Sequence, residues 1–210
     1  MSKEKAASWV YAESSVHESE LVARSRAVAH ELGISTLSPA SCAFLASLAA
    51  LPHVRTIAEV GTGAGTTAIT MLEASAKASV TTIDVDAEAQ SRARAAFESM
   101  GIGSSRYRLI NGRSADLLPR LAGSAYDLVL IDGDLLEAAG DVEEALRILR
   151  PGGMLVLAHA LYEDRVANPV RRDEVTVAMR NLGTELLASE QSHASLLPLG
   201  DGIIFATKAS

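Results

Sequence analysis

The spacing of apolar residues changes from one segment of the chain to the next. After residue 52, short apolar runs alternate with longer amphipathic segments almost to the end of the sequence. Such nearly continuous runs are typical of parallel strands covered on both faces, and they predict strands at residues 56–61, 80–84, 107–111, 127–132 and 154–158. The intervening segments have helical periodicity at residues 66–76, 87–100, 114–121 and 137–149. This alternation predicts right-handed crossovers and a doubly wound α/β sheet.

The two ends of the chain have different patterns. Helical spacing over residues 18–32 precedes a short second helix, which starts at Ser38 with Pro39 in its first position. Near the C-terminus, a predicted helix over residues 169–187 is followed by strands at residues 195–199 and 203–207. Gly200-Asp201-Gly202 joins these two strands, and such a turn between apolar runs indicates an antiparallel pair.

Composition restricts the class of protein further. A chain of 210 residues suits one domain, and we expect N-terminal helices over residues 1–52 and an α/β core over residues 53–210. The 19 basic and 26 acidic residues give a formal net charge of −7, which disfavours nucleic acid and anionic membranes as partners. The single cysteine excludes an internal disulfide and a cysteine-based zinc site. Because the sequence has neither a signal peptide nor a membrane-spanning apolar run, we expect a soluble, cytoplasmic protein.

A glycine-rich segment follows the first predicted strand. Residues 57–67 read I-A-E-V-G-T-G-A-G-T-T, so three glycines alternate with small residues where a helix is expected to begin. The carboxyl edge of an open α/β sheet binds ligands, and glycine allows a ligand to approach the backbone closely. Asp84 ends the next strand, where its carboxylate is placed to accept hydrogen bonds from ribose hydroxyls. Together these features predict a site for a cofactor that contains a nucleoside.

The spacing of the glycines indicates which cofactor fits. In the dinucleotide fingerprint G-x-G-x-x-G, the third glycine comes three places after the second, a position that Thr66 occupies here. Glu59 lies two residues before the first glycine, where a carboxylate would repel a pyrophosphate and help to orient an ammonium group, directly or through water. S-adenosylmethionine has no phosphate and carries a sulfonium and an amino-acid tail. It therefore suits this acidic loop better than NAD does.

The same motifs carry a resemblance to a known family. E-V-G-T-G-A-G at residues 59–65 and I-D-V-D at residues 83–86 resemble motifs of the class I S-adenosylmethionine-dependent methyltransferases. Y-D-L-V-L-I-D-G-D at residues 126–134 and L-P-L-G-D-G-I-I-F-A-T-K at residues 197–208 are similar to small bacterial O-methyltransferases related to caffeoyl-CoA and catechol O-methyltransferases. The resemblance extends from about Ser14 to the C-terminus. It implies a Rossmann-like, seven-stranded, mostly parallel sheet with an antiparallel C-terminal strand, helices on both faces, and a homodimer.

The resemblance also implies which residues hold S-adenosylmethionine. Leu37 would contact the cofactor from the N-terminal helices, Asp84 would bind the ribose, and Val85 would flank it. The other implied cofactor residues are Glu59, Gly61, Thr62, Gly65 and Thr67 at the methionine portion and sugar edge, Arg113, Ser114 and Ala115 at the adenine, and Asp132 and Asp134 near the methionine end and the acceptor.

On the acceptor side the sequence departs from these relatives. In the animal and plant enzymes a divalent cation orients the acceptor hydroxyls and lowers their pKa, and its ligands are the first Asp of D-A-D-K and a later Asp-Asn pair. Asp132 matches the first of these ligands, whereas the Asp-Asn pair falls on Ala158-His159 and the lysine on Leu135. These residues do not make the usual magnesium site. Either no metal is used, or a softer ion is held by Asp132 and His159 with additional groups.

We therefore expect an S-adenosylmethionine-dependent O-methyltransferase that acts on a hydroxyl of a small, phenolic or catechol-like acceptor. Asp132 and His159 are the candidate catalytic residues, and the unperturbed histidine pKa near 6.5 suits a general base. A purely structural role for His159 at the end of a strand stays open. The alternatives are an NAD-dependent oxidoreductase and a cofactor-binding relative with lapsed catalysis. A nucleic-acid methyltransferase is disfavoured by the net charge and by D-G-D-L at residues 132–135, in place of an Asn/Asp-Pro-Pro-aromatic motif.

Overall fold

Seven strands form one sheet in the computed structural model, which describes residues 3–101 and 103–210. The strands are β1 (Thr56–Val60), β2 (Ser79–Asp84), β3 (Tyr107–Asn111), β4 (Tyr126–Ile131), β5 (Leu149–Leu157), β6 (Ser192–Leu197) and β7 (Ile203–Lys208). Their order is β3-β2-β1-β4-β5-β7-β6. Strands β1 to β5 pair in parallel, whereas β7 is antiparallel to both of its neighbours. The doubly wound sheet with an antiparallel C-terminal pair is thus confirmed.

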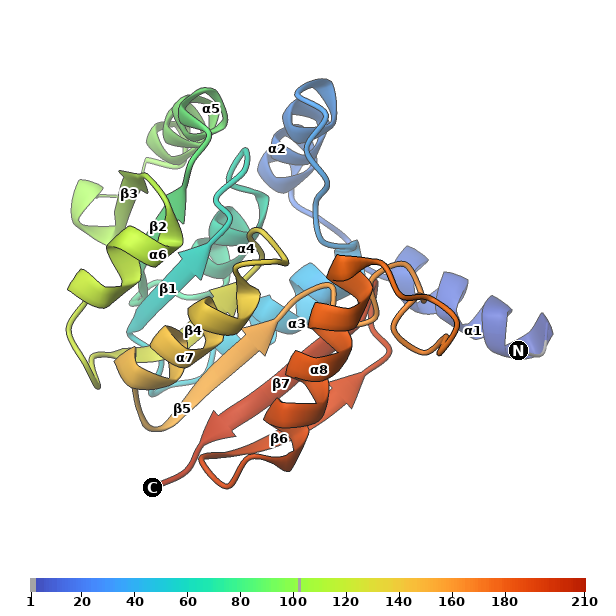
Figure 1. Cartoon of the computed structure of the whole chain (residues 1–210). Coiled ribbons are helices and arrows are strands. Elements are labelled where there is room, and N and C mark those ends of the chain that lie inside the picture. Colours follow the sequence, from blue (N-terminus) through green and yellow to red (C-terminus); the bar gives the residue numbers. More distant parts are fainter. Residues whose placement is uncertain (1–2, 102) are drawn as a thin grey trace.

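Helices cover both faces of this sheet. They are α1 (Lys3–Ser14), α2 (Glu20–Glu31), α3 (Pro39–Ala49), α4 (Thr66–Ala74), α5 (Ala87–Ser99), α6 (Ser114–Leu117), α7 (Ala138–Ile148) and α8 (Glu174–Ala188), with short 3₁₀ turns η1 (Ser104–Arg106) and η2 (Leu118–Arg120). In Figure 1, α7 and α8 cross the near face of the sheet, and α3 and α4 lie behind it. Among the residues that the structure describes, no helix is both long and apolar enough to cross a membrane.

The continuous apolar run of β4 reflects this double coverage. Leu128 and Leu130 belong to the hydrophobic cluster on the α3 and α4 face, whereas Val129 and Ile131 belong to the cluster beneath α7 and α8. All four side chains are buried. Because burying one aliphatic side chain contributes about 1.5–3 kcal/mol, a strand covered on both faces is stabilised by apolar residues at every position.

Several boundaries differ from those that the sequence predicted. Helix α8 begins at Glu174 instead of residue 169, because the Asp173 side chain caps it by accepting a hydrogen bond from the Thr176 N–H at 3.1 Å. The other shifts occur where proline, glycine or a loop interrupts the pattern. The segment 114–121 divides into α6 and η2 between Leu117 and Leu118, just before Pro119. Strand β5 extends back to Leu149, and β6 starts at Ser192.

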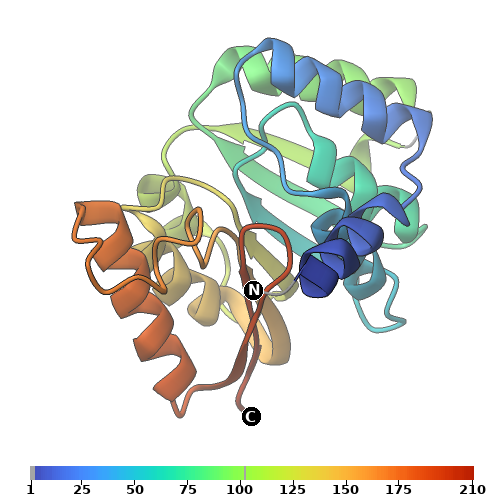
Figure 2. The same cartoon turned by 90° about the vertical axis from the view of Figure 1, so that its right-hand side faces the viewer.

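Helix α1 was not predicted from the sequence. It projects from the body of the molecule in Figure 1 and points toward the viewer in Figure 2, and none of its residues is buried. Its apolar residues have no amphipathic pattern, which explains the omission. The helix is attached through Glu13, whose carboxylate accepts hydrogen bonds from the Ala40 N–H at 2.9 Å and the Ser38 hydroxyl at 2.8 Å. Glu13 therefore caps the N-terminus of α3 from outside that helix.

Candidate active site

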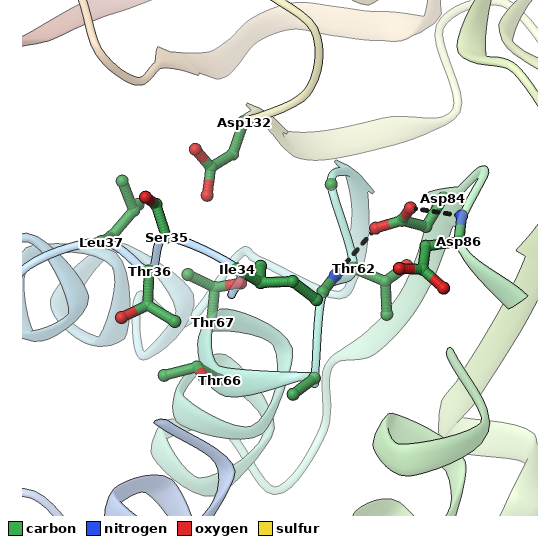
Figure 3. A pocket seen from close by; sticks show the side chains of 13 residues that line it. Ile34, Ser35, Thr36, Leu37, Thr62, Thr66, Thr67, Asp84, Asp86 and Asp132 are labelled. Atoms are coloured by element: carbon green, nitrogen blue, oxygen red, sulfur yellow. Dashed lines mark hydrogen bonds between the residues drawn. The ribbon is translucent and has the colours of Figure 1, made fainter. Parts of the chain in front are cut away.

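A pocket opens at the carboxyl edge of the sheet, between the ends of β1, β2 and β4 and the segment before α3 (Figure 3). The strand order reverses between β1 and β4, and ligands of open α/β proteins bind at such a switch point. Six of the predicted cofactor residues line the pocket: Leu37, Gly61, Thr62, Thr67, Asp84 and Asp132. The lining residues that were not among those predicted are Ile34, Ser35, Thr36, Gly63, Ala64, Thr66 and Asp86.

The glycine loop has a conformation that L-amino-acid side chains would oppose. Gly61, Gly63 and Gly65 have φ values of +94°, +48° and +92°. A Cβ atom on Gly61 would lie 2.1 Å from the backbone oxygen of Asp132, so at this point the loop lies against the end of β4. Gly65 lies outside the pocket lining, where it is the N-cap residue of α4 and packs against Ala93 and Phe97. The glycines thus allow the loop to lie between β1, β4 and α5.

Asp84 links the glycine loop to the end of β2. One carboxylate oxygen accepts a hydrogen bond from the Gly63 N–H at 2.8 Å and the other from the Asp86 N–H at 2.9 Å (Figure 3). An ionised carboxylate has about four lone-pair sites, so both oxygens can still accept bonds from ligand hydroxyls. This arrangement positions Asp84 to bind a ribose while it orders the loop.

Glu59 lies beneath the loop and does not line the pocket. Its carboxylate is fully buried and accepts hydrogen bonds from the Thr67 hydroxyl and, at 2.5 Å, from the Thr82 hydroxyl. Burial raises the pKa of Glu59 to about 8, although the two threonine hydroxyls oppose that rise. In this structure Glu59 contacts the pocket lining through the Thr67 hydroxyl, and its assignment to the cofactor stays a prediction.

We expect Glu59→Gln to preserve cofactor binding and to change the pH dependence of stability. The folded-state pKa of Glu59 is raised, so its contribution to stability is present at acidic pH and is lost as pH rises through about 8. The amide does not ionise, so the variant lacks this pH-dependent loss. The unfolding free energy of the variant should therefore rise relative to that of wild type as the pH increases from about 5 to about 9. Urea unfolding across that range and calorimetric titration with S-adenosylmethionine check both points. A loss of affinity of about 100-fold would instead indicate that the Glu59 carboxylate pairs with the ligand ammonium.

The remaining predicted cofactor residues lie at the same edge of the sheet but outside the pocket lining. The Arg113 guanidinium, after β3, pairs with the Glu137 carboxylate, and the Ser114 hydroxyl lies 3.4 Å from the same group. Asp134 accepts a hydrogen bond from the Leu136 N–H at 2.9 Å. Ala115 lies next to Ser114 in α6, and Val85, which follows Asp84, is 65% exposed. Their assignment to the cofactor stays a prediction.

Asp132, His159 and Asp201 form a hydrogen-bonded chain beside the pocket. His159 Nε2 lies 3.1 Å from Asp132 Oδ1, and His159 Nδ1 lies 2.9 Å from Asp201 Oδ2. The hydrogen bond to Asp132 raises the pKa of His159 to about 9, and Asp201 adds to this against the effect of burial. Burial raises the pKa of Asp132, while His159 opposes that rise. Each ring nitrogen of His159 faces a carboxylate oxygen, an arrangement that favours a donor on both sides and disfavours the general-base role expected from the residue type alone.

Asp201 was not predicted as a site residue. It lies in the loop between β6 and β7, and 42 residues separate it from His159 along the chain. The G-D-G sequence indicated only a turn. Strand β7 runs antiparallel beside β5, so this turn lies next to the end of β5. The contact between Asp201 and His159 therefore depends on strand pairing and cannot be predicted from the local sequence.

The donor set does not suit the magnesium site that the resemblance implies. Ala158, at one of the two replaced ligand positions, is buried and offers no side-chain donor. Asp132 and Asp201 bind opposite edges of the His159 ring, so their carboxylates do not converge on one point. In the described part of the chain, no group of three or more His, Cys, Asp or Glu side chains is arranged to hold a metal ion.

The sheet topology, the glycine loop at the switch point and the acid at the end of β2 define a class I methyltransferase fold. The O-methyltransferase family model matches residues 12–209 of this sequence. The chain belongs to the O-methyltransferase family.

Individual relatives agree with this assignment. A protein of Mycobacterium avium (strain 104), named as a candidate O-methyltransferase, is 41% identical over 199 residues, which cover 94% of this chain and 90% of the relative. A crystal structure of a Corynebacterium glutamicum protein is 32% identical, with a TM-score of 0.88 over 95% of this chain and 94% of that one. The O-methyltransferase TomG of Streptomyces achromogenes, described as involved in tomaymycin synthesis and solved in complex with S-adenosylmethionine, is 22% identical. Its TM-score of 0.86 over both full chains shows that the fold is shared.

Proposed function

We propose that this chain transfers the methyl group of S-adenosylmethionine to a hydroxyl of a small, phenolic or catechol-like acceptor. The observation that carries the proposal is the pocket in which the glycine loop, Asp84 and Asp132 meet at the switch point of the sheet. Membership of the O-methyltransferase family supports the reaction class. The S-adenosylmethionine bound to TomG, which has the same fold, supports the choice of cofactor.

Different pocket residues would bind different parts of this cofactor. When bound, S-adenosylmethionine supplies an electrophilic methyl group on a sulfonium centre. Asp84 would accept hydrogen bonds from the ribose hydroxyls, and the glycine loop, held to Asp84 through the Gly63 N–H, would lie against the methionine portion. Leu37 is buried and closes the pocket from the segment before α3. Among the described residues that line the pocket, none is basic, so the lining suits a cofactor without phosphates.

Asp132 is the residue placed to act on the acceptor. In Figure 3 its carboxylate points into the pocket from the end of β4, opposite the segment before α3. The carboxylate would orient the acceptor hydroxyl and take up its proton while the oxygen–methyl bond forms. The sulfur–methyl bond breaks in the same step, and its electron pair stays on sulfur. Positioning of the reactants in line contributes to the rate enhancement in such a transfer.

An apolar groove next to this site fits an aromatic acceptor. The groove has a volume of about 520 Å³, and it lies between α1 and the β6–β7 loop, where Trp9, Val10, Pro198 and Leu199 line it. Gly200, at its edge, lies close to Ser38, the residue that follows Leu37 of the cofactor pocket. The next residue in the loop is Asp201, which contacts His159. Aromatic and apolar lining beside a few polar groups is typical of small-molecule sites.

The proposal includes a cytoplasmic homodimer and excludes nucleic acid and membranes as partners. Tyr11 on α1 lies outside the groove lining and is 75% exposed, and a second copy would cover this aromatic side chain. The molar mass by light scattering and cell fractionation test this part of the proposal. A monomer at micromolar concentration would contradict the homodimer.

Thermal unfolding with different ligands tests the cofactor. A ligand at 100 times its dissociation constant adds about 2.7 kcal/mol to the free energy of unfolding. We expect S-adenosylmethionine and S-adenosylhomocysteine to raise the melting temperature and NAD to leave it unchanged. Stabilisation by NAD alone would favour an oxidoreductase.

A panel of catechols and other phenols then tests the acceptor, with formation of S-adenosylhomocysteine as the readout. We expect turnover with at least one of them. Cofactor binding without turnover on any hydroxyl acceptor would indicate a relative that has lost catalysis.

A further inference from the structure

The His159 imidazole is held from both sides by carboxylates of separate structural elements. Asp132 follows β4, and Asp201 comes from the β6–β7 loop. Asp201 is itself fixed, because its other oxygen accepts a hydrogen bond from the Glu163 N–H at 2.6 Å and its backbone oxygen accepts one from the Leu161 N–H at 3.0 Å. The end of β4 and the β6–β7 loop thus hold the histidine, which lies in the loop after β5, between them.

The backbone at His159 adds to the evidence for a built arrangement. Its φ of +54° lies in the left-handed region, which is uncommon for residues other than glycine. Such a conformation is strained and persists only where the surroundings enforce it. The hydrogen bond to Asp201 and the close contact with the Asp132 carboxylate are interactions strong enough to do so.

Two ring nitrogens that both face carboxylate oxygens require two donors, which only the imidazolium provides while both carboxylates are ionised. The positive charge then lies 3.1 Å from an Asp132 oxygen, at the wall of the cofactor pocket. A divalent cation bound to Asp132 would have to displace this charge or lie next to it. Coulomb repulsion and the absence of a donor at Ala158 both oppose such binding.

We propose that the His159 imidazolium takes the place of the divalent cation used by the metal-dependent relatives, and that Asp201 is the residue that positions it. This inference rests on the proposed function, because the role of the positive charge requires that a methyl group is transferred to the acceptor oxygen. His159 neutralises Asp132 and supplies positive charge near the acceptor oxygen, where negative charge develops as the hydroxyl proton leaves. Methyl transfer by this chain therefore needs no metal ion.

The charged surroundings of the pair are consistent with this role. Asp132 and Asp201 are the groups whose charges act on His159, and Asp84, across the pocket, acts on Asp132. The Cys42 thiol on α3 also lies within electrostatic range of Asp132, and its pKa is raised to about 11 by burial, so it remains neutral. His159 is thus the cationic group in contact with Asp132, while the Arg26 guanidinium donates a hydrogen bond to the Leu37 backbone oxygen at 2.6 Å on the other side of the pocket.

Metal binding tests the proposal on the wild-type protein without any acceptor. Titration with Mn²⁺, followed by the electron paramagnetic resonance signal of the free ion, should show no saturable binding at millimolar concentration. Turnover on the acceptor found in the panel should be the same after EDTA treatment and with added Mg²⁺. Stoichiometric Mn²⁺ binding that disappears in Asp132→Asn, or activity that requires a metal, would overturn the proposal.

Asp201→Asn tests the positioning role, with Asp164→Asn as the matched control. Asp164 is an exposed acid in the loop after β5 and also has a left-handed backbone, which asparagine tolerates. Histidine side chains labelled with ¹³C report the protonation of His159 by NMR, with His159→Gln identifying its signal. Asp201→Asn should lower the titration midpoint of His159 by about one unit or more, and Asp164→Asn should not. A midpoint unchanged in Asp201→Asn, or already close to 6.5 in wild type, would overturn the proposal.

Kinetics of the same variants separate positioning from a general loss of structure. Asp201→Asn should lower kcat about tenfold or more while the dissociation constant of S-adenosylmethionine stays within about twofold. Equal kcat in Asp201→Asn and Asp164→Asn would contradict the positioning role. The Mn²⁺ and NMR measurements do not depend on methyl transfer. They can therefore show a protonated His159 and no metal site even if no methyl transfer is found. Conversely, methyl transfer can be observed even if these two measurements contradict the role of His159.

Discussion

Gly61→Ala should destabilise the protein by about 3 kcal/mol or more and weaken S-adenosylmethionine binding at least tenfold. The added Cβ would lie 2.1 Å from the Asp132 backbone oxygen, and the residue would also keep a φ of +94°. Backbone atoms cannot move aside as a flexible side chain does, so the loop must shift away from β4. That shift would change the pocket, because both Gly61 and Asp132 line it.

Gly33→Ala provides the control for backbone conformation. Gly33 has a φ of +71°, but a Cβ there would meet nothing within 4 Å. It should therefore cost only about 1–2 kcal/mol, which is the penalty for a left-handed residue. Urea unfolding and calorimetric titration of both variants check the comparison. Equal losses of stability and affinity would mean that the contact with the end of β4 is not what requires glycine at position 61.

Asp132→Asn is the substitution with the largest expected effect on chemistry. We expect kcat to fall about 100-fold or more, since the amide cannot accept the acceptor proton and no longer pairs with the His159 cation. The dissociation constant of S-adenosylmethionine should change less, by about tenfold at most, because Asp84 and the glycine loop stay in place. Steady-state kinetics with the acceptor found in the panel and calorimetric titration separate the two effects.

Asp164→Asn again serves as the matched control, because it replaces an exposed aspartate outside the pocket. Its kcat should equal that of wild type. If Asp132→Asn retained wild-type turnover, the proton would have to leave to another group or to water, and the assignment of Asp132 would be wrong.

The sequence predicted the sheet well because its strands are buried on both faces. A run such as β4, with apolar side chains toward both helical layers, has a pattern that is independent of its neighbours. Helix α1 escaped prediction for the opposite reason, since no face of it is buried and its contact with the body depends on Glu13. The start of α8 was predicted at residue 169 because the helical periodicity extends to residues before Asp173. The capping residue Asp173, a local signal, sets the start at Glu174.

The site was predicted in part. The glycine loop and Asp84 have local signatures, because close backbone approach needs glycine and a ribose needs a strand-end acid. Residues 34–36 line the same pocket, but they lie in an irregular segment without a motif. Glu59 illustrates the limit of a motif, since its position next to the loop was clear from the sequence and its burial beneath Thr67 was not.

By itself, the sequence determined the fold class, the family resemblance, the carboxyl edge of the sheet as the ligand site, and the departure from a magnesium site at Ala158-His159. Each of these depends on periodicity or on a motif within one segment. Only the tertiary structure placed Asp201 against His159, because that contact joins two loops that the antiparallel return of β7 brings together. The protonation of a histidine depends on which charges surround it in space. The sequence therefore suggested a general base at His159, and only the fold supports the proposed imidazolium between two carboxylates.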